Sequence, residues 1–213
     1  METEAKATQA VAVTVGKAVD AGVEIGRFIG KVLGTVPQDA VGVIVGDWLR
    51  EVRIRNIHRL QQRTEEVLGQ REDARVEPVS PTLAIPLFEA AQDESRTELQ
   101  ELWARLLANA MDGSRSGVRT SFIEAIKKLD ALDAVVLDKI ASFGGAQTVV
   151  YHDSWPEQLG VREDELFVSF DNLKRLGCIS DYNNVALHNT ITGDELRLYV
   201  THFGRELMRA CAL

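Results

Sequence analysis

The chain has 213 residues, of which 45% are hydrophobic and 26% are charged. This is the composition of an ordinary globular protein, and it excludes long disorder, collagen-like repeats and a polytopic membrane protein. Lys and Arg total 24 against 32 Asp and Glu, which gives a net charge of -8. Each third of the chain is close to neutral or acidic, which argues against a protein that binds nucleic acid non-specifically.

Motifs for catalysis or metal binding are missing from the sequence. Cys178 and Cys211 are too few for a disulfide framework or a zinc ribbon, and the four histidines show no ligand spacing with them. Cys178 follows Gly177 in an apolar setting, so we expect a buried structural thiol there. There is no phosphate-binding loop and no Gly-x-Ser-x-Gly nucleophile turn, so we expect no enzyme, no cofactor and no metal. The first residues lack the basic and then apolar order of a signal peptide, which favours a cytoplasmic protein.

The first predicted domain, residues 1–78, combines a glycine-rich helix with a basic helix. Helical periodicity over about 8–36 stops at Pro37, and a long basic helix reaches Leu68 with Gly69 as its stop. Residues 69–86, with three prolines and a mixed charge run, are typical of a connector.

The second predicted domain, residues 79–146, is a helical core. Apolar residues follow helical spacing over 87–111, with Trp103 in the core and Asp93 as a helix restart inside the run. Two further helices are expected at 121–129 and 130–143, and Asp130 is an N-cap for the second.

The third predicted domain, residues 147–213, has a different pattern. Helices at 156–159 and 163–176 end at glycines, strands are expected at 185–189 and 196–201, and a helix follows at 203–211. This order is typical of a winged-helix module. The fold class is therefore mainly α, a helical bundle followed by a small α+β winged-helix-like module.

Four glycines at four-residue spacing form the most specific local pattern: Gly22, Gly26, Gly30 and Gly34. They leave one helix face nearly bare, and each costs about 1 kcal/mol of helix propensity relative to alanine. Close approach of another helix would offset that cost, in lipid or in protein. Five charges between residues 17 and 31 argue against a spanning helix. A buried helix in a bundle or oligomer and a membrane-active segment both remain open, and the glycines are our candidate self-association residues.

The basic helix is a second candidate site, for an anion or a partner. Its arginines are Arg50, Arg53, Arg55, Arg59 and Arg63. They could meet phosphates, but they do not form one stripe. The alternative is that they pair with acidic residues elsewhere or lie over the core.

The second helix of the winged-helix-like module is acidic. Its charged residues are Glu163, Asp164, Glu165 and Asp171 against Lys174 and Arg175. Because acidic groups repel phosphate, DNA binding is disfavoured and the helix is expected to contact protein.

Four segments carry a family resemblance. They are GDWLREVRIRN at 46–56, LQELWARLLA at 99–108, the segment 122–137, and THFGR at 201–205 with Cys211. Together they resemble the abortive-infection alpha family over about residues 40–211. The resemblance implies a role in bacterial defence against phage and supplies no catalytic residue, and the glycine series lies outside its best-matching part.

These observations favour a non-enzymatic, cytoplasmic phage-defence protein that acts through self-association or membrane disturbance. The expected partners are further copies of the chain, a membrane surface at which the protein is peripheral, and a phage or host protein. The alternative is a winged-helix regulator or adaptor that binds a protein or nucleic-acid partner.

Overall fold

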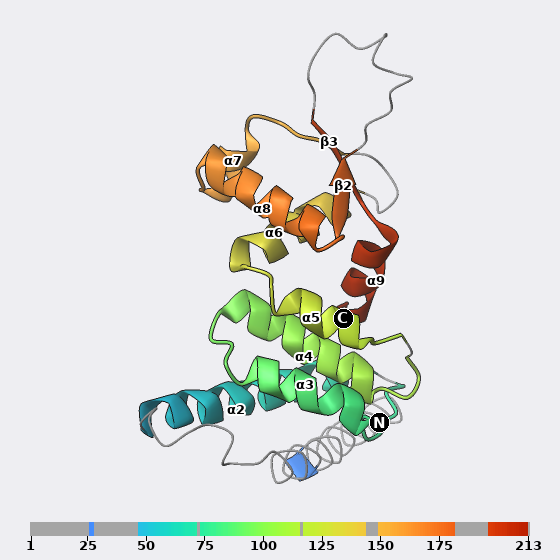
Figure 1. Cartoon of the computed structure of the whole chain (residues 1–213). Helices are drawn as coiled ribbons and strands as arrows, with labels where there is room; N and C mark the ends of the chain where they lie inside the picture. The colour runs from blue at the N-terminus through green and yellow to red at the C-terminus, as the bar shows by residue number, and fades with distance from the viewer. Residues whose placement is uncertain are drawn as a thin grey trace, which may run out of the picture. The chain divides into compact units, whose positions relative to one another are not determined.

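The computed structural model describes residues 26–27, 47–71, 73–115, 117–143, 149–181 and 196–212. They are mainly helical with a small antiparallel sheet near the C-terminus, which confirms the predicted fold class (Figure 1). The chain forms two compact units. Unit 1 comprises Met1–Glu124 and Ala210–Leu213, and unit 2 comprises Ala125–Arg209.

Unit 1 is built on three packed helices, α2 (Asp47–Gly69), α3 (Pro81–Ala91) and α4 (Thr97–Met111). The next helix, α5 (Thr120–Ile126), begins in unit 1, and its last two residues belong to unit 2. The buried residues of α2 recur every three or four positions, so that one face of the helix packs along α4: Asn56, Ile57, Leu60, Thr64, Val67 and Leu68. The basic helix predicted to end at Gly69 is confirmed.

The prediction for the α3 and α4 region was wrong in two places. Pro86, assigned to a connector, lies inside α3, where the buried Leu87 and Phe88 compensate for the backbone hydrogen bond that proline cannot donate. The sequence predicted that a helix begins again at Asp93, but α4 begins three residues later, with Arg96 as its N-cap.

Tertiary contacts explain the break between the two helices. Asn56 Nδ2 of α2 donates to Gln92 O at 2.9 Å, and Gln100 Nε2 donates to Glu94 O at 2.8 Å. These bonds satisfy carbonyl groups that a continuous helix would have used itself.

Unit 2 has α6 (Ala131–Ser142), α7 (Trp155–Leu159), α8 (Glu163–Arg175) and α9 (His202–Ala210), whose last residue belongs to unit 1. Its sheet contains β1 (Val149–Val150), β2 (Ile179–Asp181) and β3 (Arg197–Val200) in the order β1-β3-β2, with all neighbours antiparallel. The pairing sets Val149 opposite Leu198 and Ile179 opposite Val200.

Most helices of unit 2 lie where the sequence predicted them. Asp130 is the N-cap of α6, and its N–H donates to Asp133 Oδ2 at 2.7 Å. Gly160 and Gly177 follow α7 and α8 with φ of 67° and 72°, the left-handed conformation that favours glycine after a helix.

The strands were predicted less completely. The strand expected at 196–201 is confirmed as β3, whereas β1 and β2 were missed. Both are two or three residues long, and their pairing with β3 rather than a local pattern defines them. The strand expected at 185–189 lies outside the described residues.

Candidate functional site

Of the glycine series, Gly26 is described, and Gly22, Gly30 and Gly34 lie outside the described residues. Gly26 is helical, and a Cβ at this position would lie 3.4 Å from Gln61 Nε2 of α2. At Gly26, therefore, the bare face lies against a helix of the same chain.

Two of the five candidate arginines hold α2 to the segment between α3 and α4. The Arg53 guanidinium donates to both Asp93 oxygens, with Nε at 2.5 Å from Oδ1. Arg63 Nη1 donates to Thr97 O at 3.0 Å and lies 3.7 Å from Glu101 Oε2. These contacts orient the helix, which is a structural role.

The other three arginines, Arg50, Arg55 and Arg59, are exposed and form no ion pair within the described part of the chain. Trp48, Arg55 and Arg59 are spaced by seven and four residues, so they lie on one side of α2. Trp48 is 71% exposed, which is unusual for so large an apolar side chain. We call these three residues the arginine face.

A second surface lies on α8, where the exposed residues Asp164, Phe167, Val168 and Asp171 follow helical spacing. Val168 is 69% exposed, and carboxylates flank the apolar pair on both sides. We call these four residues the α8 face. The sequence pointed to its carboxylates, but not to the apolar pair between them.

Aromatic rings pack against Phe167 of the α8 face and against one another. Phe167 packs edge-on against Phe170 and Tyr151, with ring centroids 5.6 and 5.5 Å away. Tyr151 and Phe170 also contact the buried Trp155. These ring contacts hold the Phe167 side chain in place on the helix.

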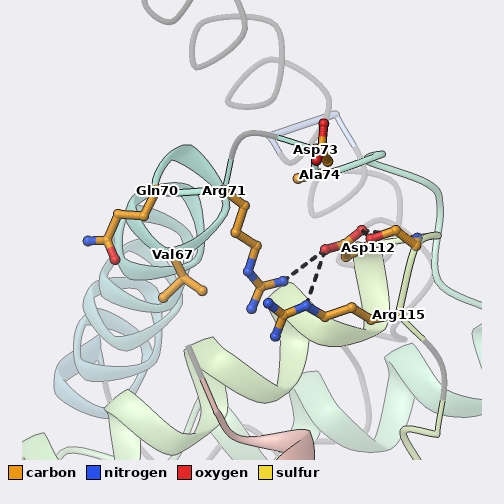
Figure 2. A pocket seen from close by; sticks show the side chains of 8 residues that line it. Val67, Gln70, Arg71, Asp73, Ala74, Asp112 and Arg115 are labelled. Carbon is orange, nitrogen blue, oxygen red and sulfur yellow. Dashed lines mark hydrogen bonds and ion pairs between the residues drawn. The ribbon is translucent and has the colours of Figure 1, made fainter.

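A third group of polar residues lies in unit 1, where two arginines converge on one carboxylate (Figure 2). Arg71 Nη1 is 3.1 Å from Asp112 Oδ2, and Arg115 Nε is 3.7 Å from the same oxygen. The two guanidinium groups also share Asn109, because Arg71 Nη2 and Arg115 Nη1 donate to its Oδ1 at 2.9 and 3.2 Å. We call these four residues the Arg71 cluster.

The other oxygen of Asp112 is fully engaged as well. Ser114 donates to Oδ1 through its backbone N–H at 3.0 Å and its hydroxyl at 2.6 Å, and the Arg75 N–H lies 3.4 Å away. Burial alone would raise the pKa of Asp112, but the hydrogen bonds from Ser114, Arg75 and Arg71 outweigh it and lower that pKa. Asp112 is therefore a stable anion at neutral pH.

Three members of the Arg71 cluster, Arg71, Asp112 and Arg115, line a cavity of about 420 Å³, together with Val67, Ala74 and Asp73 (Figure 2). The Arg71 side chain is only 9% exposed, and its Nε has no hydrogen-bond partner. Burial lowers the pKa of Arg71, and the positive charge of Arg115 lowers it further. No pattern in the sequence points to this group, because Arg71 lies in a mixed charge run and Asp112 directly follows the helix expected over 87–111.

The described residues contain no strong candidate for nucleophilic or metal chemistry. Burial raises the pKa of the Cys178 and Cys211 thiols to about 12, so both stay protonated, and the predicted buried role of Cys178 is confirmed. Among the described residues, no three His, Cys, Asp or Glu side chains are grouped to hold a metal ion. Within the same residues, no helix is both long and apolar enough to cross a membrane.

The sequence of this chain matches the model of a known protein family. The model of the family described as abortive infection alpha matches residues 52–211, most of the chain. The chain belongs to the abortive infection alpha family. Comparisons with curated proteins and with solved structures found no significant match.

Membership of the abortive infection alpha family points to a role in phage defence. The matched residues include the α8 face and the Arg71 cluster, whereas Trp48 and the glycine series precede them. The family match thus covers all of the α8 face and the Arg71 cluster, and of the arginine face it covers Arg55 and Arg59.

Proposed function

We propose that this protein is a non-enzymatic phage-defence protein that acts by self-association in the cytoplasm. In the proposed contact, the arginine face of one copy binds the α8 face of a second copy. The carrying observation is the complementarity of the two faces, because each combines an exposed apolar side chain with charged residues on the same side of one helix, and the charges of the two faces are opposite.

The charges support the pairing. Arg55 and Arg59 form no ion pair within the described residues, and Asp171, 3.9 Å from Lys174, keeps a side chain that is 80% exposed. Opposite charges that meet across an interface guide association and fix its register, and the apolar centre contributes most of the affinity. Trp48 is the kind of residue that dominates such contacts.

Contact between two different faces is head-to-tail, so repeated contacts produce a ring or an open chain of copies. An assembly of this kind can depend steeply on concentration, which suits a response triggered by infection. The packing of Gly26 against α2 in the same chain also favours contacts in protein over disturbance of a lipid bilayer.

Reversal of the charges on each face tests the proposal. One variant carries Arg55→Glu and Arg59→Glu, and the other carries Asp164→Arg and Asp171→Arg. Each variant alone should have the mass of one chain by light scattering, and an equimolar mixture should form a larger species. Arg119→Glu, an exposed reversal outside both faces, is the control and should behave as the parent. A mixture that stays monomeric, or a parent protein that is monomeric at all concentrations, contradicts the proposal.

Function in cells is tested with the same variants. Each charge reversal should abolish protection against phage, and co-expression of the two should restore it. Leakage from liposomes measured with the parent protein tests membrane disturbance, and strong leakage by monomeric variants would favour that mechanism instead.

A second candidate function, as a winged-helix adaptor or regulator, is favoured by the topology of unit 2. Its element order, with a three-stranded sheet ordered β1-β3-β2, is the order expected for such a module. The acidic α8 favours a protein partner over DNA. Duplex DNA should bind no more tightly than the non-specific range of about 10⁻⁴ to 10⁻⁶ M, and nanomolar binding to a defined sequence would favour a regulator.

A further inference from the structure

We propose that α2 of one copy packs antiparallel to α8 of the second copy, so that Arg55 and Arg59 bind the acidic start of α8, where Glu163 extends the contact. This inference rests on the proposed function, because it assigns a direction and a further residue to the contact between the two faces. It is drawn from the order of the residues along each helix and from the charges at the two ends of α8.

The order of the residues along α2 makes the contact directional. Arg55 and Arg59 both follow Trp48, at about 10.5 and about 16.5 Å along the helix axis. On the α8 face, the exposed apolar surface on which Trp48 can pack is provided by Phe167 and Val168. Once Trp48 lies there, both arginines extend toward the same end of α8.

The two ends of α8 carry opposite charges. Acidic residues occupy its first turn and basic residues its last turn: Glu163, Asp164 and Glu165 against Lys174 and Arg175. Asp171 lies nearer the last turn, 3.9 Å from Lys174, and is partly compensated within the chain. Arginines directed to the last turn would meet cations, whereas arginines directed to the first turn meet carboxylates. The favourable direction is therefore the antiparallel one.

A group of residues beside Phe167 enlarges the acidic surface at the start of α8. The Tyr151 hydroxyl donates to Glu163 Oε1 at 3.3 Å, and the Tyr151 ring packs edge-on against Phe167 with ring centroids 5.5 Å apart. Burial raises the pKa of Tyr151, and the negative charges of Glu163 and Asp153 raise it further. Both carboxylates therefore lie near the phenol, next to the apolar side chains on which Trp48 packs.

These carboxylates are not compensated by the arginine that precedes α8. Within the part of the chain that the structure describes, Asp153, Glu163 and Asp164 form no ion pair. Arg162 is held by Glu165 at 2.7 Å, and Glu165 lies about 160° around the helix from Glu163. The Arg162–Glu165 pair is therefore on the other side of α8.

Two further cations belong to elements that pack near Tyr151. Lys139 of α6 lies 5.2 Å from the centroid of the Trp155 ring and forms no ion pair with a described carboxylate. Arg197 alternates along β3 with the buried Leu198, which places the two side chains on opposite faces of the sheet. Lys139 thus offsets one of the three carboxylates at the start of α8, and two negative charges remain for the two arginines.

One carboxylate on α2 opposes the contact. Glu51 is exposed between Trp48 and Arg55 in the sequence, about 60° around the helix from Trp48. In the antiparallel direction its charge lies near the carboxylates of α8, where the two arginines outweigh it. Removal of the Glu51 charge should therefore strengthen the association.

The concentration at which the mean mass reaches twice that of one chain, measured by light scattering, tests the direction. Glu163→Gln, at an exposed residue, should raise that concentration at least about threefold. Glu165→Gln removes the same charge from the same helix turn, and Asp171→Asn removes a charge from the other end of the α8 face. Both controls should stay within about twofold of the parent, and Glu51→Gln should lower the concentration about twofold.

A double-mutant cycle tests the assigned pair. Arg59→Gln combined with Glu163→Gln should weaken the association little more than either change alone, because each removes one partner of the same contact. Arg59→Gln combined with Asp171→Asn should weaken it as Arg59→Gln does. Additive losses for Arg59→Gln and Glu163→Gln contradict the pairing.

The inference is overturned if Asp171→Asn or Glu165→Gln weakens the association as much as Glu163→Gln does. The outcome is separable from that of the proposed function. If the mixture of charge-reversed variants described above assembles while Glu163→Gln behaves as the parent, the direction is wrong and self-association stands. If the parent is monomeric at all concentrations, the proposed function fails, and the direction fails with it.

Discussion

The Asp112 carboxylate lies 3.1 Å from the Arg71 guanidinium, and the Asp112 side chain is only 1% exposed. The pair joins the end of α2 to the end of α4 across an interval of 41 residues. Removal of one member of a buried pair leaves an uncompensated charge and is strongly destabilising.

Asp112→Ala should therefore lower the free energy of unfolding by about 3 kcal/mol, measured by urea denaturation. Asp73→Ala, an exposed carboxylate in the neighbouring loop, is the matched control and should leave that free energy nearly unchanged. Equal midpoints for Asp112→Ala and the parent would show that the pair contributes nothing to stability.

The same carboxylate makes stability depend on pH. The pKa of Asp112 is lower in the folded protein than its ordinary value of 3.8, so its contribution is complete above about pH 4 and is lost as pH falls through the folded pKa. Asp112→Asn should destabilise the protein near neutral pH and reduce the slope of stability against pH below about pH 4. Melting temperatures across that range measure the effect, and parallel curves for variant and parent would contradict it.

Trp103 tests the core of unit 1. Its side chain is 1% exposed on α4, as the helical spacing predicted. Trp103→Ala should lower the free energy of unfolding by about 3 to 5 kcal/mol because it leaves a large cavity. Trp48→Ala is the control, because Trp48 is exposed and its loss should change stability by less than about 0.5 kcal/mol. If Trp48→Ala destabilised the chain as much as Trp103→Ala, the assigned faces of the two helices would be wrong.

Gly204 tests the packing of α9 on the sheet of unit 2. A Cβ at this position would collide with the carbonyl of Cys178 and lie 2.8 Å from Val200 Cγ1. Since backbone cannot easily yield, Gly204→Ala should cost about 1 to 3 kcal/mol. A Cβ at Gly69 meets nothing within 4 Å, so Gly69→Ala should cost nothing and gain up to about 1 kcal/mol. Thermal melts of the two alanine variants should therefore shift in opposite directions.

The elements that the sequence predicted well are those with local causes. The helices α2 and α8 follow apolar spacing and end near glycines, and Asp130 at the start of α6 is a local cap. Trp103 and Cys178 were expected in the core because apolar side chains surround them in the sequence, and both are buried. Such features depend on neighbouring residues, which a single sequence displays directly.

The parts that the sequence did not predict depend on contacts between distant residues. The break before α4 needs Asn56, 36 residues away from Gln92, and β2 exists because Ile179 pairs with Val200. The Arg71 cluster joins residues separated by about 40 positions, and nothing local distinguishes Arg71 from its charged neighbours. The α8 face was half predicted, since its carboxylates are visible in sequence but the exposure of Val168 is a result of folding.

Substitutions of Gly26 distinguish a role in packing within the chain from a role in self-association. Its open side faces Gln61, whose Nε2 also donates to Glu65 Oε1 at 2.8 Å. An alanine fits, because the nearest atom is the end of a flexible side chain, and Gly26→Ala should gain up to about 1 kcal/mol of helix propensity.

Gly26→Leu should instead displace Gln61 and lower the free energy of unfolding by about 1 kcal/mol or more, while the mass measured by light scattering stays that of the parent. Arg27→Leu, the exposed neighbour on the same helix, should change neither quantity. If Gly26→Leu reduced the mass and left the melting temperature unchanged, Gly26 would serve contacts between copies. The glycine series would then join the arginine face and the α8 face as a surface for self-association.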